Sequence, residues 1–123
     1  MAVIPAEFIT DHPQYGRAVL YRWVDLVSTD TGAPVIIPLR SGTIFMVYST
    51  FVNFGSIQWD TTLDPTGILF VPVLDRDTVA PNDPIDMTEN SIRVGLNCGI
   101  YLRPRKTGNI NPATCYALVI VRE

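Results

Sequence analysis

The sequence has little of what enzymes and metal proteins need. It contains one histidine, His12, and two cysteines, Cys98 and Cys115, in 123 residues. A nucleophile and its base must be held within hydrogen-bond reach, and His12 lies in a proline-broken stretch that offers no rigid frame. The motifs G-x-S-x-G, H-E-x-x-H and C-x-x-C and a glycine-rich phosphate loop are absent. The sequence therefore predicts no catalytic residue, no cofactor and no metal site, and a protein that is not an enzyme.

Charge is also scarce, which excludes some partners. Charged residues make up 17% of the chain, and the net charge of −3 argues against a nucleic-acid binder, which needs a dominant basic face. No apolar run approaches the ~20 residues that span a bilayer, so we expect no membrane insertion. No secretory signal is visible in residues 1–16, which lack an early Lys or Arg. Hydrophobic residues reach 47%, enough for one well-packed domain.

What the chain does contain is short apolar segments separated by turn formers, with no sustained helical period. In residues 56–60 the alternation puts Ile57 and Trp59 on one face and the polar side chains on the other. The pattern predicts an all-β fold, an antiparallel β-sandwich or jelly roll of about eight short strands, with a closed barrel as the alternative. The predicted strands lie near residues 18–28, 33–39, 43–52, 55–61, 67–73, 91–96, 99–103 and 114–122.

The chain divides into two parts by pattern. Residues 17–123 form the predicted single β-sandwich domain, and residues 1–16 precede it as an extended N-terminal arm. The arm packs either on its own domain or on a neighbour, and we favour the neighbour. Its apolar residues, which are candidate partner contacts, are Val3, Ile4, Phe8 and Ile9.

The acidic residues 74–90 and the cysteines each allow two interpretations. Calcium takes six to eight oxygen ligands, often from a loop, but aspartates also cap turns and keep loops soluble, and the solvated loop is favoured. Cys98 and Cys115 lie in or beside predicted strands and are either two reduced, packed thiols, which we favour, or a pair with a disulfide or redox role.

The aromatic residues raise a separate possibility, a sugar-stacking platform on a β-sandwich. Trp59 alternates with Ile57, so its pattern favours the core. The face on which Trp23 lies is ambiguous because it follows Arg22 and precedes Val24.

Three of the nine cations gather at one strand end, "YLRPRK". Pro104 cannot donate to a sheet ladder, so we expect this strand to lie at an edge or to leave the sheet there. The cations either dock on an acidic patch of a partner, or Arg103 pairs with an internal carboxylate such as Asp60 or Asp75 and the others are solvated. The candidate partner-binding residues of this cluster are Arg103, Arg105 and Lys106.

The second half of the chain resembles a pattern found in small structural proteins of tailed bacteriophages. A strand with S-x-x-W is followed by a G-x-Y-x-R-P element, a Thr-Gly turn and a last apolar strand, over roughly residues 50–123. Residues 74–90 are longer than in that pattern, and the arm lies outside it. The matching residues are Ser56, Trp59, Gly99, Tyr101, Arg103, Pro104, Thr107, Gly108 and 116–121.

The resemblance implies a virion component, specifically a capsid decoration (cement) protein on the outer surface of the phage head, assembled in the host cytoplasm. Its implied partners are the major capsid protein and further copies of itself in a homo-oligomer of unknown symmetry. The alternatives are a head–tail connector, tail or fibre-base subunit, a carbohydrate- or host-surface-binding β-sandwich, and a cytosolic binding domain unrelated to phage.

Overall fold

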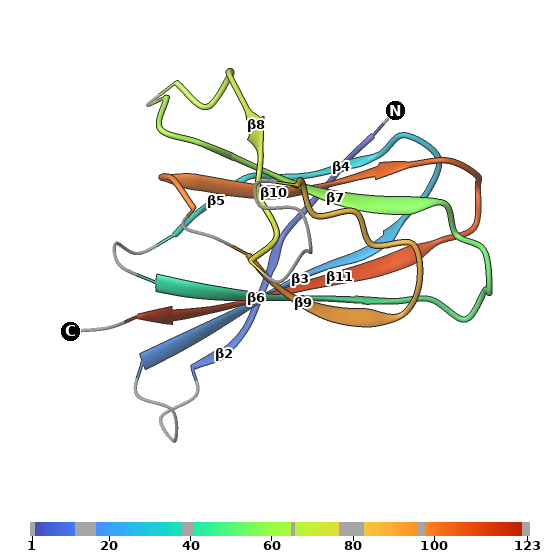
Figure 1. The fold of residues 1–123 in the computed structure, drawn as a ribbon, viewed down its shortest axis with the longest axis horizontal. Helices are drawn as coiled ribbons and strands as arrows, with labels where there is room; N and C mark the ends of the chain where they lie inside the picture. The colour runs from blue at the N-terminus through green and yellow to red at the C-terminus, as the bar shows by residue number, and fades with distance from the viewer. Residues whose placement is uncertain are drawn as a thin grey trace.

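The computed structural model describes residues 2–11, 17–37, 41–64, 66–76, 83–95 and 98–121. The described chain is all β, and the strands lie in two layers packed face to face (Figure 1). The predicted β-sandwich is confirmed, and each predicted strand range overlaps an observed strand. The described part of the chain contains no helix that would span a membrane.

Sheet A forms the upper layer in Figure 1, in the order β1-β4-β10-β7-β8, with β5 also pairing with β10. All of its pairs are antiparallel except β1 with β4. The strands of sheet A are β1 (Val3–Ile4), β4 (Thr31–Gly32), β5 (Val35–Ile36), β7 (Ser56–Thr62), β8 (Val71–Pro72) and β10 (Tyr101–Thr107).

Sheet B forms the lower layer, in the antiparallel order β2-β3-β11-β6-β9. Its middle strand, β11, is hydrogen-bonded on both sides although it comes last among the described strands. The strands of sheet B are β2 (Glu7–Asp11), β3 (Arg17–Leu26), β6 (Ser41–Tyr48), β9 (Ser91–Gly95) and β11 (Ala113–Val121).

An aromatic cluster fills the space between the sheets. Trp59 of sheet A lies with its ring centroid 5.6 Å from that of Trp23 and 4.4 Å from that of Phe45, both of sheet B. The Trp23 indole N–H donates to the carbonyl of Ala33 at 2.9 Å, which satisfies its polar atom in the core. Trp59 is buried as its alternation predicts, and Trp23, whose face was ambiguous, is buried with it.

The segment expected to be an arm is part of the sandwich where it is described. Residues 3–4 pair with β4 in sheet A, and residues 7–11 pair with β3 in sheet B. The chain therefore crosses from one layer to the other between β1 and β2 (Figure 1). Unlike the arm favoured from sequence, which reaches a neighbour, residues 2–11 lie against their own domain because unpaired edges of both sheets are available to them.

Pro104 lies inside sheet A, and the expectation of an edge strand was wrong. β10 has β7 on one side and the two short strands β4 and β5 on the other. The Lys106 N–H donates to the carbonyl of Asp30, just before β4. Backbone nitrogens two residues apart in a strand point to the same side, so the Pro104 nitrogen also faces β4. At that position a Cβ on Gly32 would lie 2.5 Å from Pro104 Cδ. The absence of a side chain at Gly32 therefore leaves space for the Pro104 ring, which lies where another residue would have a backbone N–H.

Candidate protein interface

The basic strand end predicted from sequence is divided between the two faces of β10. Successive residues of a strand point to opposite sides, and in β10 the burial alternates along its whole length. Arg103 and Arg105 point outward from sheet A, whereas Lys106 points into the sandwich and is 0% exposed. The prediction that Lys106 docks on a partner, and its alternative of a solvated lysine, are both wrong.

Lys106 is held by groups of its own chain. Its ammonium Nζ donates to the carbonyl of Asn109 at 2.6 Å. Burial lowers the pKa of Lys106 below its ordinary value, and the nearby Asp30 carboxylate acts in the opposite direction. Asp30 also accepts hydrogen bonds from the backbone N–H groups of Ala2 and Val27. This buried charge cluster ties the first residues to the core and is not a docking site.

The two outward arginines share one internal carboxylate, which is the alternative that the sequence left open for Arg103. Asp60 on β7 is 4% exposed, and its Oδ2 lies 3.4 Å from Arg103 Nε. The same oxygen accepts a hydrogen bond from Arg105 Nε at 3.1 Å. The Arg103 guanidinium also stacks over the Phe70 ring, 3.9 Å from the centroid. Sheet A therefore neutralises most of this charge internally.

The other candidates from sequence do not converge on one site. Val3 and Phe8 are exposed, Ile4 packs against the core and Ile9 lies near a register shift of β2, so the four are spread over both sheets. His12 lies outside the described residues. Neither cysteine, both of which are described, forms a disulfide.

The acidic loop is partly described, and its carboxylates make separate contacts. Asp75 forms an ion pair with Arg93 at 3.7 Å, and Asp86 accepts a hydrogen bond from Gln58 at 2.9 Å. Among the described residues, no three acidic, histidine or cysteine side chains group closely enough to hold a metal ion. Asp77 lies outside the described residues.

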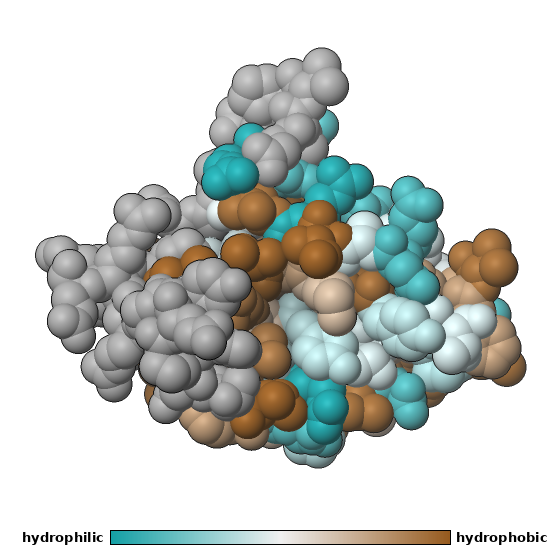
Figure 2. Space-filling view, turned by 90° about the horizontal axis from the view of Figure 1, so that it is seen from below, coloured by the Kyte–Doolittle hydropathy of each residue, from teal (hydrophilic) through white to brown (hydrophobic). Residues whose placement is uncertain are grey.

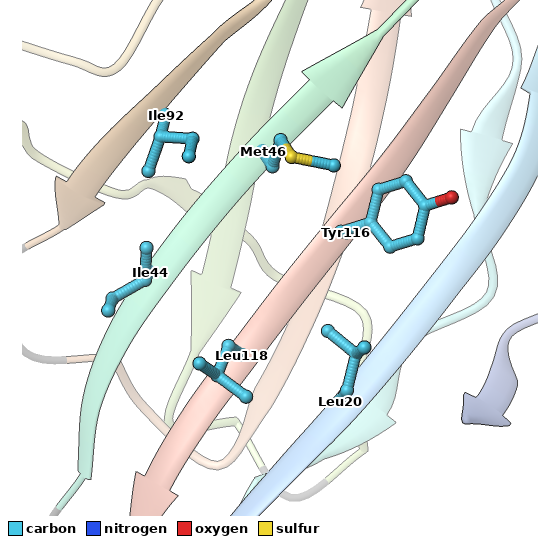
Figure 3. Close-up of a pocket in the computed structure, with 6 residues that line it drawn as sticks. All are labelled: Leu20, Ile44, Met46, Ile92, Tyr116 and Leu118. Atoms are coloured by element: carbon cyan, nitrogen blue, oxygen red, sulfur yellow. The ribbon is translucent and has the colours of Figure 1, made fainter. Parts of the chain in front are cut away.

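The surface that sequence reasoning missed is the outer face of sheet B. Side chains from four neighbouring strands form two rows across it, one containing Met46 and one containing Leu118 (Figure 3). Figure 2, seen from the sheet B side, shows apolar residues gathered in a band across this face. A shallow hollow of about 390 Å³ lies between the rows. We call these residues the sheet B patch: Leu20, Ile44, Met46, Ile92, Tyr116 and Leu118.

Charge is confined to the rim of the sheet B patch in the described residues. Arg22 on β3 forms an ion pair with Glu7 on β2, with Nη2 and Oε2 2.6 Å apart. Hydrogen bonds to Glu7 and then to Tyr116 raise the pKa of Arg22, so it stays charged. Asp25 contacts Thr114 at another point of the rim. The interior of the patch is uncharged.

A second apolar surface lies at the right-hand end of the sandwich in Figure 1, where the β6–β7 and β10–β11 turns meet. Val52 is 99% exposed, Phe51 next to it on the β6–β7 turn is exposed, and so is Ile110 on the β10–β11 turn. The Asn53 carbonyl accepts hydrogen bonds from the side chains of Asn109 and Asn111, at 3.1 and 2.7 Å. This network joins the two turns, and we call Phe51, Val52 and Ile110 the apolar tip.

A third exposed group is held by Asp64. Its carboxylate accepts hydrogen bonds from the backbone N–H groups of Thr66, Ile68 and Leu69 and from the Thr66 hydroxyl. These bonds, chiefly those from Thr66, lower the pKa of Asp64 from 3.8 to about 2. The turn presents Ile68 and Leu69 to solvent. Three separate places on the molecule thus carry apolar side chains that solvent reaches, half-buried in most of the sheet B patch and exposed in the other two.

Comparison with known proteins adds little about function. No family model matches the chain, and no curated protein matches it. Among solved structures, a cupin domain from Bordetella pertussis Tohama I is similar, with 11% sequence identity and a TM-score of 0.45. The alignment covers 98% of this chain and 99% of that one. A likeness of this size supports no statement about activity or partners.

Proposed function

We propose that this protein is a non-enzymatic structural subunit of a virion, specifically a capsid decoration protein that binds the major capsid protein on the outside of a phage head. The observation that carries the proposal is the presence of solvent-accessible apolar side chains on two separate surfaces, the half-buried sheet B patch with its exposed Ile92 and the exposed apolar tip. A soluble monomer has little use for several such surfaces. A lattice subunit needs more than one, because it contacts more than one neighbour.

The phage assignment itself rests on the sequence resemblance. The apolar surfaces support it only in that a protein of a capsid lattice needs such contact surfaces. Decoration multiplies modest contacts over a symmetric lattice, provided that the geometry lets them form together. A rigid sandwich suits this task because its contact surfaces lose little conformational freedom on binding. The tip is such a surface, since the Asn53 hydrogen bonds fix its two turns to each other.

The test is the copy number of this protein in purified particles of a phage that encodes it, measured by quantitative mass spectrometry against the major shell protein. We expect a ratio within a few-fold of one. A dozen copies or fewer would contradict decoration and favour a connector or tail role. Absence from the particle would contradict a virion role altogether.

Occupancy of decoration-free particles by variants then locates the contact. We expect Val52→Asp in the apolar tip to reduce occupancy at least tenfold, because a carboxylate there would be buried against the shell. Ile36→Asp is the matched control, since Ile36 on the outer face of sheet A is also largely exposed. Equal occupancy of Val52→Asp and the unmodified protein would show that the tip is not the shell contact.

A further inference from the structure

The sheet B patch lies on a sheet face that, in a lone domain, would face water. Antiparallel sheets of soluble monomers pack one face on the core and keep the other polar. β11 departs from that pattern, because its inward set Cys115, Ala117 and Val119 is buried while the outward side chains Tyr116 and Leu118 are also apolar. A strand that is apolar on both sides is typical of a sheet covered on both faces.

We propose that the sheet B patch packs against the same patch of a second copy of this chain, so that two sandwiches form a dimer of four layers. The inference deepens the proposed function and rests on it only for its biological setting, the capsid surface. It assigns one surface to self-association and leaves the apolar tip for the shell. Its support is the charge, the shape and the area of the patch.

Charge favours a copy over a different partner. In an isologous contact the same patch lies on both sides, so a charge near the two-fold axis would face a like charge. The six patch residues carry no charge, and Arg22, which ends the Met46 row on β3 beside Tyr116, is already paired with Glu7. An acidic or basic partner would find nothing to bind there. The net charge of −3 is thus carried by other parts of the molecule.

Shape favours a flat, sheet-like occupant. Figure 3 shows the six side chains standing on neighbouring strands, and the hollow among them is shallow. Two such faces pack with their strands within about 30° of each other and the sheets about 10 Å apart. The Leu and Ile side chains of one copy then interdigitate with those of the other.

The area comes close to that of a specific interface once the rim is included. Four strands about 4.8 Å apart and about six residues long span on the order of 400 Å². Two copies would bury twice that, and the exposed Val24 and Tyr48 at the ends of β3 and β6 extend the contact. The total approaches the ~1,000 Å² that a specific interface needs.

The experiment is sedimentation equilibrium of the purified full chain over a wide concentration range. We expect twice the chain mass of 13.7 kDa, with dissociation on dilution. Ile92→Asp is expected to weaken the dimer at least tenfold, because Ile92 is 64% exposed in the free chain and its carboxylate variant would bury a charge. Ile36→Asp, at 63% exposure on sheet A, is expected to leave the dimer unchanged.

Hydroxyl-radical footprinting of the unmodified protein tests the same contact without a variant. Met46 and Tyr116 are expected to lose reactivity as the protein concentration rises, whereas Tyr101 on the outer face of sheet A keeps it. A monomer at all concentrations, or a dimer in which Met46 and Tyr116 stay reactive, would overturn the inference. A dimer of a protein that is absent from virions would sustain it and refute the proposed function. A protein that is monomeric in solution but present in virions at the copy number of the shell protein would refute the dimer and support the proposed function.

Discussion

The outer faces of the two sheets are opposites, although each is built from two long central antiparallel strands. In sheet A, the outward residues of β7 and β10 pair as Ser56 with Thr107, Gln58 with Arg105 and Asp60 with Arg103. In sheet B, the outward residues of β6 and β11 pair as Met46 with Tyr116 and Ile44 with Leu118. One face is polar and its charges are paired within the domain, whereas the other is apolar and half-exposed.

The difference teaches where a contact surface is to be sought on a small sandwich. The sequence contains a cluster of cations in β10, but carboxylates of the same domain compensate their charges: Asp60 pairs with the two arginines, and Asp30 lies near Lys106. The outer face of sheet B contains no sequence motif, and its apolar side chains are not fully buried within a single domain. Charge that is already paired gives little binding energy, whereas uncovered apolar area gives more.

The largest expected effect is the difference in stability between substitutions on the inward and outward sides of β10. Lys106→Glu is expected to destabilise the fold by about 3–5 kcal/mol, because it places a second carboxylate near Asp30 in the core. Arg105→Glu, one residue away but pointing outward, is expected to cost less because Arg105 is partly solvated. Urea denaturation of both variants gives the comparison.

Lys106→Met supplies the control for that experiment. An apolar side chain of similar length is expected to cost less than Lys106→Glu, because it leaves Asp30 without its cation but adds no second carboxylate, and the Asn109 carbonyl keeps its other donor, the Ser28 N–H. If Lys106→Met and Lys106→Glu were equally destabilising, the cost would come from loss of the ammonium and its contacts, not from the added carboxylate.

A smaller effect is expected at the carboxylate that serves both arginines. Asp60→Asn is expected to cost about 1.5–3 kcal/mol, the range for hydrogen bonds to charged groups. Glu7→Gln, which breaks the more exposed pair with Arg22 on sheet B, is the matched control and is expected to cost at most about 1 kcal/mol. Thermal unfolding of the two variants measures both costs. Equal losses of stability in Asp60→Asn and Glu7→Gln would contradict this prediction.

The smallest effect is local to the turn of Asp64. Its pKa of about 2 lies below the ordinary 3.8, so its contribution is complete above about pH 3.8 and is lost as the pH falls through about 2. An NMR titration of the carboxyl carbon checks the value. Faster amide exchange at Ile68 and Leu69 in Asp64→Asn is expected, because the amide has one acceptor oxygen where the carboxylate has two. A titration near 3.8 would refute these hydrogen bonds in solution.

Sequence reasoning succeeded where the pattern is local. The alternation around Trp59 fixed its face, and the apolar segments located the strands. It failed at Lys106 because Pro104 was interpreted as a strand end, although period-two spacing already places Leu102, Pro104 and Lys106 on one side. The residue that permits the strand to continue, Gly32, lies far away in the chain, and no local pattern reveals it.

Two other parts were missed for different reasons. β1 and β2 have no clear period because their partners, β4 and β3, decide their structure. The outer face of sheet B did leave a signal, the unbroken apolar run of residues 116–121, in which both alternating sets are apolar. Such a run indicates a strand covered on both faces, but what covers the second face is not encoded in the strand itself.

The position of β11 has a consequence for the biosynthesis of this protein. β11 lies between β3 and β6, both of which are synthesised long before it, so sheet B cannot form until the ribosome has passed Val121. Until then β3 and β6 each lack a neighbour and expose unpaired backbone and apolar side chains, which favour association with other nascent chains. We therefore expect the chain to be most prone to association before this single strand is inserted.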